Sequence, residues 1–363
     1  MKIRAERDDL ADAFGRANRA VGARAAAPPL TGVLCDVTGS TLRVTGTDLE
    51  ITVRTMIEVE VLEEGRSVIP AKFVTEAIRK MPVGAVTLES NEGELTITGQ
   101  GPKFTVREFS VDEFPVLEAP DMANATAVDG DQLAEAIAQV TVAASADATR
   151  PILTGVLVEN DDDGVRLVAT DSYRLAVRTV TGVAAPETGG LVPARGLREL
   201  TRTVGTNNVQ MAVPPREAVF RSDLGTITMR LIEGTFPNYR QLLPDSYPNR
   251  VVVNREGLLE ALARAELVAE DHIPVRLKMA DGGVEITVTR QDVGGEAEHL
   301  AGDYSGEADD VLIAFNPRYL RDGVSVMNAE EIEIQVIDGL KPSVIRGVGQ
   351  EDFLYLLMPV RIP

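Results

Sequence analysis

The sequence has few of the residue types that build metal centres and disulfide frameworks. It contains one cysteine, Cys35, and two histidines, His272 and His299. A single cysteine cannot form a disulfide within the chain, and its place in an apolar run indicates a buried thiol in a reducing cytoplasm. The histidines lie 27 residues apart and have no cysteine or patterned carboxylate beside them, which does not favour zinc. The sequence therefore predicts neither a metal nor a cofactor.

Recognisable catalytic and phosphate-binding motifs are also missing. There is no Gly-x-x-x-x-Gly-Lys loop, no Gly-x-Gly-x-x-Gly after a strand, and no nucleophile elbow around a serine. Carboxylates are plentiful, but their positions single out no acid–base pair. We therefore expect a protein that is not an enzyme.

Long apolar runs are absent as well. No run approaches the roughly 18 residues that a membrane-spanning helix needs, and residues 1–4 lead into acidic residues rather than an apolar signal segment. Of the 363 residues, 44% are hydrophobic and 25% are charged, as in a large soluble protein. We expect a cytoplasmic protein with no membrane partner.

The chain does contain one pattern written three times. Pro70, Pro193 and Asn316 are spaced by 123 residues, and each follows a short apolar run and opens a helix-like segment. Two further pairs of segments keep the same offset: 31–34 with 154–157, and 47–48 with 170–171. A period of about 120 residues is the usual size of a domain with its own core. We expect three domains, 1–121, 122–246 and 247–363, with boundaries where proline and acidic residues cluster.

Each repeat predicts an α+β domain of antiparallel sheet plus two helices. The first, amphipathic helix is expected to open each repeat, at 7–24, 129–147 and 255–271. The second helix is expected at 70–81, 193–204 and 316–327. Alternating apolar residues indicate strands at 42–46, 95–98, 165–168, 284–288 and 332–336. Proline at a first helical position, and Asn316 as an N-cap before Pro317, account for the second helix starts.

Charge is unevenly distributed along the chain. The formal net charge is −20, which alone argues against a nucleic-acid partner, because phosphates favour basic surfaces. The three second-helix segments run against this trend, with net charges of +2, +2 and +1. One such segment would be an ordinary solvated helix face. Recurrence at equivalent positions of three repeats favours a shared basic surface.

Three segments are more distinctive than the repeat requires: 169–176 (Ala-Thr-Asp-Ser-Tyr-Arg-Leu-Ala), 236–244, and the apolar 355–363. Terminal segments are commonly frayed and polar, so we expect the last of these to be tied down. Together with 45–50 (Thr-Gly-Thr-Asp-Leu-Glu), they resemble in order and spacing the bacterial DNA polymerase III β subunits, the sliding clamps of replication. The resemblance covers the whole of 1–363.

The resemblance implies a DNA clamp fold in which two three-domain chains join head to tail into a homodimeric ring around duplex DNA. DNA held by topology needs only a modest basic surface and no sequence recognition. The implied function is a DNA polymerase processivity factor. Its implied partners are a second copy, duplex DNA, the DNA polymerase III alpha and clamp-loader subunits, and other clamp-motif proteins of replication and repair.

The residues expected to face DNA come from two sources. The resemblance implies Arg24, Lys72 and Arg195, and the charge pattern adds Arg79, Lys80, Arg198 and Arg202. They are expected to meet phosphates without reading sequence.

The resemblance also implies a cleft between the second and third domains that binds short peptides of partner proteins. An apolar pocket would receive the peptide's anchor side chains, and Arg174 and Arg361 would donate hydrogen bonds at its rim. The residues implied are Leu153, Thr170, Ser172, Tyr173, Arg174, Leu175, Pro237, Gln241, Leu242, Met358, Pro359, Val360, Arg361 and Ile362. Alternatively, Leu175 and Met358 are core residues and Asp171 belongs to an Asx-turn.

Departures from the family pattern leave partner preference open. Val360 stands where many clamps have methionine, Gln241 where many have a basic residue, and Pro363 extends the usual end. Two alternatives therefore remain beside the main interpretation. One is a second clamp copy with altered cleft specificity, and the other is a clamp-derived adaptor that binds partner peptides without encircling DNA.

Overall fold

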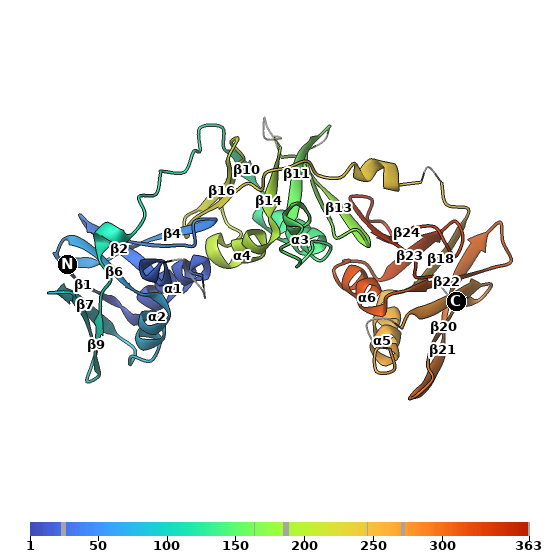
Figure 1. Ribbon diagram of the computed structural model, residues 1–363, viewed down its shortest axis with the longest axis horizontal. Helices are drawn as coiled ribbons and strands as arrows, with labels where there is room; N and C mark the ends of the chain where they lie inside the picture. Colours follow the sequence, from blue (N-terminus) through green and yellow to red (C-terminus); the bar gives the residue numbers. More distant parts are fainter. Residues whose placement is uncertain (23–26, 163, 184–188, 245, 270–272, 362–363) are drawn as a thin grey trace. The chain divides into compact units, whose positions relative to one another are not determined.

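The computed structural model describes residues 1–22, 27–162, 164–183, 189–244, 246–269 and 273–361. Its helices form three pairs, as predicted (Figure 1). They are α1 (Arg7–Ala17) and α2 (Ala71–Arg79), α3 (Gly130–Thr141) and α4 (Ala194–Val204), and α5 (Arg255–Ala265) and α6 (Pro317–Ser325). With the antiparallel sheets below, they confirm a fold of three α+β repeats.

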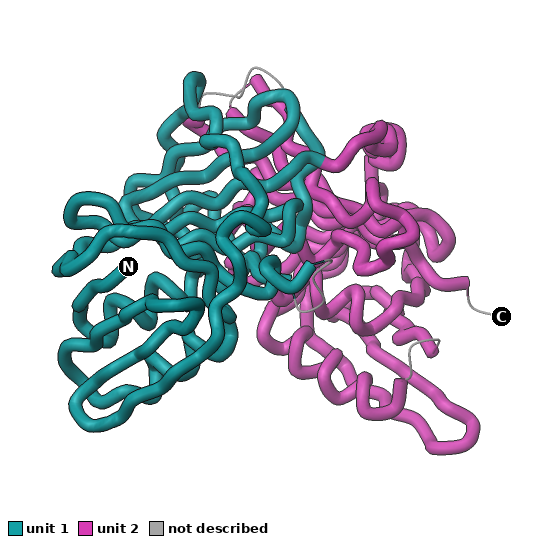
Figure 2. Tube along the Cα trace, turned by 60° about the vertical axis from the view of Figure 1, so that its left-hand side comes forward, with its two compact units in different colours: residues 1–134, 186–231 teal, residues 135–185, 232–363 magenta. Residues whose placement is uncertain are grey.

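The chain divides into two compact units (Figure 2). Unit 1 comprises 1–134 and 186–231, and unit 2 comprises 135–185 and 232–363. The second repeat therefore contributes residues to both units.

Unit 1 contains two antiparallel sheets. The first has the order β5 (Glu60–Glu63), β1 (Lys2–Glu6), β7 (Ala85–Asn91), β8 (Glu94–Thr98) and β9 (Lys103–Arg107). The second has the order β10 (Thr126–Val128), β15 (Val209–Ala212), β16 (Glu217–Ser222), β17 (Gly225–Arg230), β4 (Ile51–Glu58), β3 (Thr41–Thr47), β2 (Gly32–Thr38) and β6 (Gly65–Pro70). Thr226 of β17 lies opposite Arg54 of β4, so strands of the second repeat extend the sheet of the first.

Unit 2 contains one continuous antiparallel run of strands. Its order is β11 (Gly155–Asp161), β12 (Gly164–Thr170), β13 (Arg174–Thr181), β25 (Phe353–Leu357), β24 (Ser343–Gly347), β23 (Glu331–Val336), β18 (Asn249–Asn254), β21 (Gly294–Gly306), β20 (Gly283–Arg290), β19 (Val275–Ala280) and β22 (Asp310–Phe315). Arg174 of β13 lies opposite Leu357 of β25, so the second and third repeats also share a sheet. β14 (Gly190–Pro193) leads into α4.

The expectation that a helix opens each repeat is wrong. The short strands β1, β10 and β18 come before α1, α3 and α5. β1 has only five residues and is fixed by pairing with the distant β5 and β7, a non-local contact that short-range periodicity does not report. The first helix is also shorter than 7–24, because α1 ends at Ala17 and a 3-10 turn, η1 (Asn18–Ala20), follows.

In unit 1 the helices cover one face of the larger sheet. The hydroxyl of Thr55 in β4 donates to the Ala13 carbonyl of α1, at 3.3 Å. Gly46 lies so close to α1 that a Cβ would be 2.1 Å from the Ala17 carbonyl oxygen. The core between them includes Phe14 and Cys35, both fully buried, and burial raises the pKa of the Cys35 thiol. Each large apolar side chain buried there contributes roughly 1.5–3 kcal/mol.

Candidate functional site

The turn between β12 and β13 is fixed by its own side chains. The Thr170 hydroxyl donates to the Arg174 carbonyl at 2.7 Å. Asp171 Oδ1 accepts from the backbone N–H groups of Tyr173 and Arg174, at 2.9 and 3.1 Å. Ser172 has a φ of +83°, in the left-handed region. Asp171 is therefore an Asx-turn residue, and the turn presents Tyr173 with 56% of its surface exposed.

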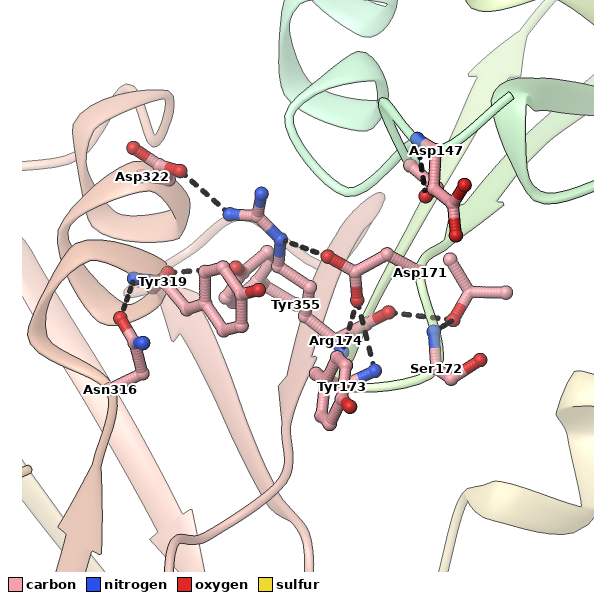
Figure 3. A network of polar contacts seen from close by, with 11 residues as sticks. Asp147, Asp171, Ser172, Tyr173, Arg174, Asn316, Tyr319, Asp322 and Tyr355 are labelled. Atoms are coloured by element: carbon pink, nitrogen blue, oxygen red, sulfur yellow. Dashed lines mark hydrogen bonds and ion pairs between the residues drawn. The ribbon is translucent and has the colours of Figure 1, made fainter. Parts of the chain in front are cut away.

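Arg174 lies beneath this turn, in a network of polar contacts with the third repeat (Figure 3). Its Nε donates to Asp171 at 3.0 Å, and a terminal nitrogen donates to Asp322 of α6 at 2.7 Å. The guanidinium also lies 4.3 Å from the ring centroid of Tyr319. Burial opposes the charge, but the interactions with Tyr355, Asp322 and Asp171 outweigh it and raise the pKa of Arg174.

This geometry corrects one expectation about Arg174. The side chain is only 9% exposed, so it does not lie at the rim as a donor for an incoming peptide. Its donors are used inside the protein, where they join the β12–β13 turn to α6. Arg361, the other expected rim donor, is exposed.

The C-terminal segment is tied down, as predicted. The Met358 N–H donates to the Tyr173 carbonyl at 2.9 Å, and the Val360 N–H donates to the Ala314 carbonyl of β22 at 2.8 Å. Met358 is 37% exposed, so it is a surface residue and not core. Ile362 lies outside the described residues.

An apolar cluster forms the floor next to the turn. Leu175 is 1% exposed and packs with Val168, Tyr239, Val344 and Leu356. Of the two interpretations given for Leu175, the structure therefore supports the one that makes it a core residue. The 236–244 segment lies over this floor. Phe236 packs against the cluster, Tyr239 is part of it, and the Tyr239 hydroxyl donates to Glu159 at 2.5 Å.

The structure thus brings most of the predicted peptide-site residues onto three neighbouring segments of unit 2. The turn supplies Ser172 and Tyr173, the tail supplies Met358 to Arg361, and both are joined by the Met358–Tyr173 hydrogen bond. Exposed residues on or beside the 3-10 turn η5 (Tyr239–Leu242) are Pro237, Gln241 and Leu242. Leu153 is buried in the 3-10 turn η4 (Pro151–Thr154), and its part in a cleft stays a prediction.

Sequence reasoning missed the contribution of α6. Tyr319 lies beside Tyr173, with ring centroids 6.2 Å apart, and Asp322 holds Arg174. Asn316 was predicted only as an N-cap, and it does accept from the Tyr319 N–H, at 3.1 Å. Helical spacing places Tyr319 and Asp322 on one helix face, but it does not show that this face meets the second repeat.

Tyr247, which packs against the apolar floor, allows a test by pH. Its buried hydroxyl has no hydrogen-bond partner among the described residues, and burial raises its pKa to about 12. The folded state therefore holds this proton more tightly than the unfolded state. The resulting stability is present below pH ~10 and is lost as pH rises toward 12.

We expect Tyr247→Phe to leave stability near pH 8 unchanged or slightly higher, because no hydrogen bond is lost. Between pH 10 and 12 the variant should lose about 1–2 kcal/mol less than the parent, a figure that allows for partial exposure. Urea unfolding at a series of pH values measures this. Equal alkaline losses in the two proteins would contradict the assignment.

Six of the predicted DNA-facing residues lie within the described part of the chain, and all six are in or next to α2 and α4 of unit 1. Three on α4 are exposed along one face, namely Arg195, Arg198 and Arg202. Three in or next to α2 are also exposed, namely Lys72, Arg79 and Lys80. Arg24 lies outside the described residues.

Three of these six cations form ion pairs with acidic neighbours. Arg195 binds Asp48 at 2.6 Å and Glu50 at 3.1 Å. Arg79 pairs with Glu76 at 3.2 Å, and Arg202 with Glu199 at 3.6 Å. These are exposed pairs of low strength, which a phosphate could replace.

Within the described part of the chain, no group of three or more histidine, cysteine, aspartate and glutamate side chains is arranged to hold a metal ion. The described helices are all too short or too polar to cross a membrane.

Comparison with known proteins identifies the family. Three family models match, described as the N-terminal, central and C-terminal domains of the DNA polymerase III beta subunit, at residues 1–118, 127–238 and 240–361. The chain is 32% identical to a beta sliding clamp of Streptomyces coelicolor, with both chains covered fully. It is 31% identical to the beta sliding clamp homolog GriR of Streptomyces muensis, over 99% of each chain.

Solved structures agree with this. The DNA polymerase sliding clamp of Bacillus subtilis superposes with a TM-score of 0.94 at 27% identity, and both chains are covered fully. The Pseudomonas aeruginosa sliding clamp bound to griselimycin superposes with a TM-score of 0.91 at 25% identity, again with full coverage.

Proposed function

Because this chain belongs to the DNA polymerase III beta subunit family, the beta sliding clamps, we propose that it is a processivity factor that encircles duplex DNA. Two copies close head to tail into a ring, which holds DNA polymerase and other clamp-motif proteins on the template. The ring acts in the cytoplasm and performs no chemistry of its own. DNA is retained by topology, so binding is independent of sequence.

The observation that carries this proposal is a pair of sheet edges that have no partner strand among the described residues. Within the chain, β17 pairs with β4 and β25 pairs with β13. β17 is the last strand of the second repeat, and it pairs with the last strand of the β2–β3–β4 meander in the first repeat. In the same way, β25 is the last strand of the third repeat, and it pairs with the last strand of the β11–β12–β13 meander in the second repeat. The equivalent last strand of the first repeat is β9, which lies at the edge of its sheet. The equivalent strand of the third repeat is β21, whose residues 294–301 pair, among the described strands, with β20 alone.

A second copy can pair with both edges. Because the two edges belong to different repeats, the contact is head to tail and closes into a ring when its rotation divides the circle. The edges are of opposite charge, since β9 carries Lys103 and Arg107 and β21 carries Glu296 and Glu298. One carboxylate oxygen of Glu296 is buried without a hydrogen-bond partner in the described chain, and burial raises the pKa of this side chain.

Reversing the charge of the β9 edge should weaken this dimer. We expect the double variant Lys103→Glu and Arg107→Glu to raise the dimer dissociation constant at least tenfold, because like charges then face each other across the contact. Analytical ultracentrifugation at several concentrations measures it. Arg4→Glu, an exposed change elsewhere in the same sheet, is the control and should leave the dimer intact. If the double variant dimerises as tightly as the control, the β9 edge is not part of the dimer contact.

We further propose that α2 and α4 supply the DNA-facing surface. Lys72 and Lys80 form no ion pair among the described residues, and Arg195 is held at Asp48 and Glu50 until a phosphate takes their place. Arg79, Arg198 and Arg202 complete the basic set, and Arg24 belongs to it by family resemblance. Such contacts position the ring on the backbone and carry no base recognition.

Partner peptides are proposed to bind across the turn, the tail and the η5 segment of unit 2. Exposed Tyr173, Leu242 and Met358 surround the apolar floor and offer surfaces for apolar anchors. Methionine adapts to different side chains, which suits a site shared by several partners.

A further inference from the structure

The η5 segment of unit 2, residues 236–244, forms one wall of the proposed peptide site but has little backbone support. Its residues Pro237, Gln241 and Leu242 are exposed on that wall. In the described part of the chain its backbone hydrogen bonds are local, such as the one from the Leu243 N–H to the Arg240 carbonyl at 3.3 Å, and none joins it to a strand. Side chains therefore decide where this wall lies.

One carboxylate, that of Glu159 in β11, holds the middle of the segment. It accepts from the Tyr239 hydroxyl at 2.5 Å, and both terminal nitrogens of Arg240 donate to it, at 2.7 and 3.5 Å. Two bonds from one guanidinium fix its orientation as well as its distance. The Arg240 guanidinium also lies 4.8 Å from the ring centroid of Tyr239. Two consecutive residues of η5 are thus fixed to the same side chain.

Glu159 lies on the sheet directly beside the apolar floor. Side chains alternate along a strand, so Glu159 is on the same face as Leu157, which packs against the floor. The side chain of Glu159 is 20% exposed. Burial and Glu159 raise the pKa of the Tyr239 hydroxyl, which therefore keeps its proton and donates. Because its oxygens are occupied by Tyr239 and Arg240, Glu159 acts on a bound peptide through the segment and not by direct contact.

The first repeat uses the matching carboxylate differently. The offset of 123 residues makes Asp36 the counterpart of Glu159. Strand register agrees, because each lies opposite an arginine of the next strand, Arg43 or Arg166. Asp36 pairs with Arg66 at 4.0 Å, on the edge strand β6, and so is directed to the sheet itself.

The segment that corresponds to 236–244 in the first repeat also lacks the donors. Both segments contain Phe-Pro, at 114–115 and at 236–237, which sets Leu117 and Glu118 against Tyr239 and Arg240. Neither a leucine nor an ionised glutamate side chain can donate a hydrogen bond to a carboxylate. The segment held by a carboxylate therefore occurs in the unit that carries the proposed peptide site, and not at the matching place in unit 1.

We propose that Glu159 is a positioning residue for partner-peptide binding. It holds Tyr239 and Arg240 so that Pro237 and Leu242 already lie beside the apolar floor when a peptide arrives. Without Glu159 the segment has to be ordered during binding, and the cost of that ordering lowers the affinity. The proposal rests on the proposed function of the unit 2 site and adds to it a residue that the sequence did not indicate.

The first measurement follows the segment in the full-length chain without any peptide. Cleavage by a protease requires local opening of the chain. In Glu159→Ala, thermolysin cleavage between Gln241 and Leu242, mapped by mass spectrometry, should be at least tenfold faster than in the parent. Glu159→Gln keeps an oxygen that accepts from Tyr239, so its rate should lie between the two.

Glu333→Ala is the matched control. Strand register places Glu333 on the same face of the sheet as the floor residue Val344, and Glu333 pairs with Arg250 at 3.6 Å, outside the segment. This variant loses the same kind of side chain from the same sheet. It should be cleaved like the parent.

The second measurement is binding of a fluorescein-labelled clamp-motif peptide of a polymerase alpha subunit, followed by anisotropy. Glu159→Ala should raise the Kd about tenfold, Glu159→Gln by only a few fold, and Glu333→Ala should bind like the parent. Leu242→Ala removes a contact that Glu159 positions, so adding Glu159→Ala to it should weaken binding much less than in the parent. General destabilisation would weaken both backgrounds equally. Thermal melting confirms that each variant is folded.

Faster cleavage and weaker binding in Glu159→Ala, with the control unchanged, support the proposal. It is overturned if Glu159→Ala binds at the parent affinity, if its effect is the same with and without Leu242, or if cleavage is not accelerated. Failure of the peptide site itself looks different, because the parent would then bind no polymerase peptide even though cleavage still rose in Glu159→Ala. That result would overturn both the site and the role of Glu159 in it.

Discussion

Deletion of residues 358–363 should abolish binding of a clamp-motif peptide, with a loss of at least a hundredfold, while the chain remains folded. The tail contributes exposed Met358 beside Tyr173 and is held by two backbone hydrogen bonds. A few buried anchors carry most of the energy of such interfaces, so loss of one wall of the site removes most of the affinity. Anisotropy with a labelled polymerase peptide measures the change.

Met358→Leu is the matched control, because it keeps side-chain volume and apolar character at the same position. It should retain affinity within a few fold. Binding of the polymerase peptide to the truncated chain at the parent affinity would show that the site lies elsewhere in the molecule.

Substitution of Arg174 by methionine should cost about 3–5 kcal/mol of stability, because it leaves Asp171 and Asp322 without their buried counter-charge. The distances of 3.0 and 2.7 Å and the 9% exposure of Arg174 show that two carboxylates hold this charge in a nearly buried position. The free energy of unfolding in urea at pH 7 gives the value.

Asp322→Asn provides the comparison. The amide oxygen can still accept a hydrogen bond, so the loss should be clearly smaller than for Arg174→Met. Combining Arg174→Met with Asp322→Leu should recover part of the stability, because one uncompensated charge is gone. A cost below about 1 kcal/mol for Arg174→Met would mean that water, not the two carboxylates, balances this guanidinium.

The elements that the sequence predicted well are those with local signals. Alternation of apolar residues located β3, β8, β12, β20 and β23, and proline or asparagine at the repeat motif located α2, α4 and α6. The N-cap at Asn316 was predicted, and the Asx-turn at Asp171 was one of two alternatives, because each depends on hydrogen bonds within a few residues.

Contacts between distant segments were not predictable in the same way. The residues around Arg174 in the sequence do not show that its side chain reaches Asp322, which is 148 residues away. Arg174 was therefore expected at the rim of the peptide site. The strands that open the repeats were missed for the same reason, because β1 is defined by partner strands far along the chain.

The most direct test of the ring is retention on circular DNA. The protein is loaded onto a nicked plasmid with a matching clamp loader and ATP, separated from free protein by gel filtration at 0.5 M salt, and followed before and after the plasmid is linearised. High salt screens phosphate contacts, so a topological link should survive it. We expect stable retention on the nicked circle and release on linearisation. Equal retention on circular and linear DNA, or a monomer that never loads, would contradict it.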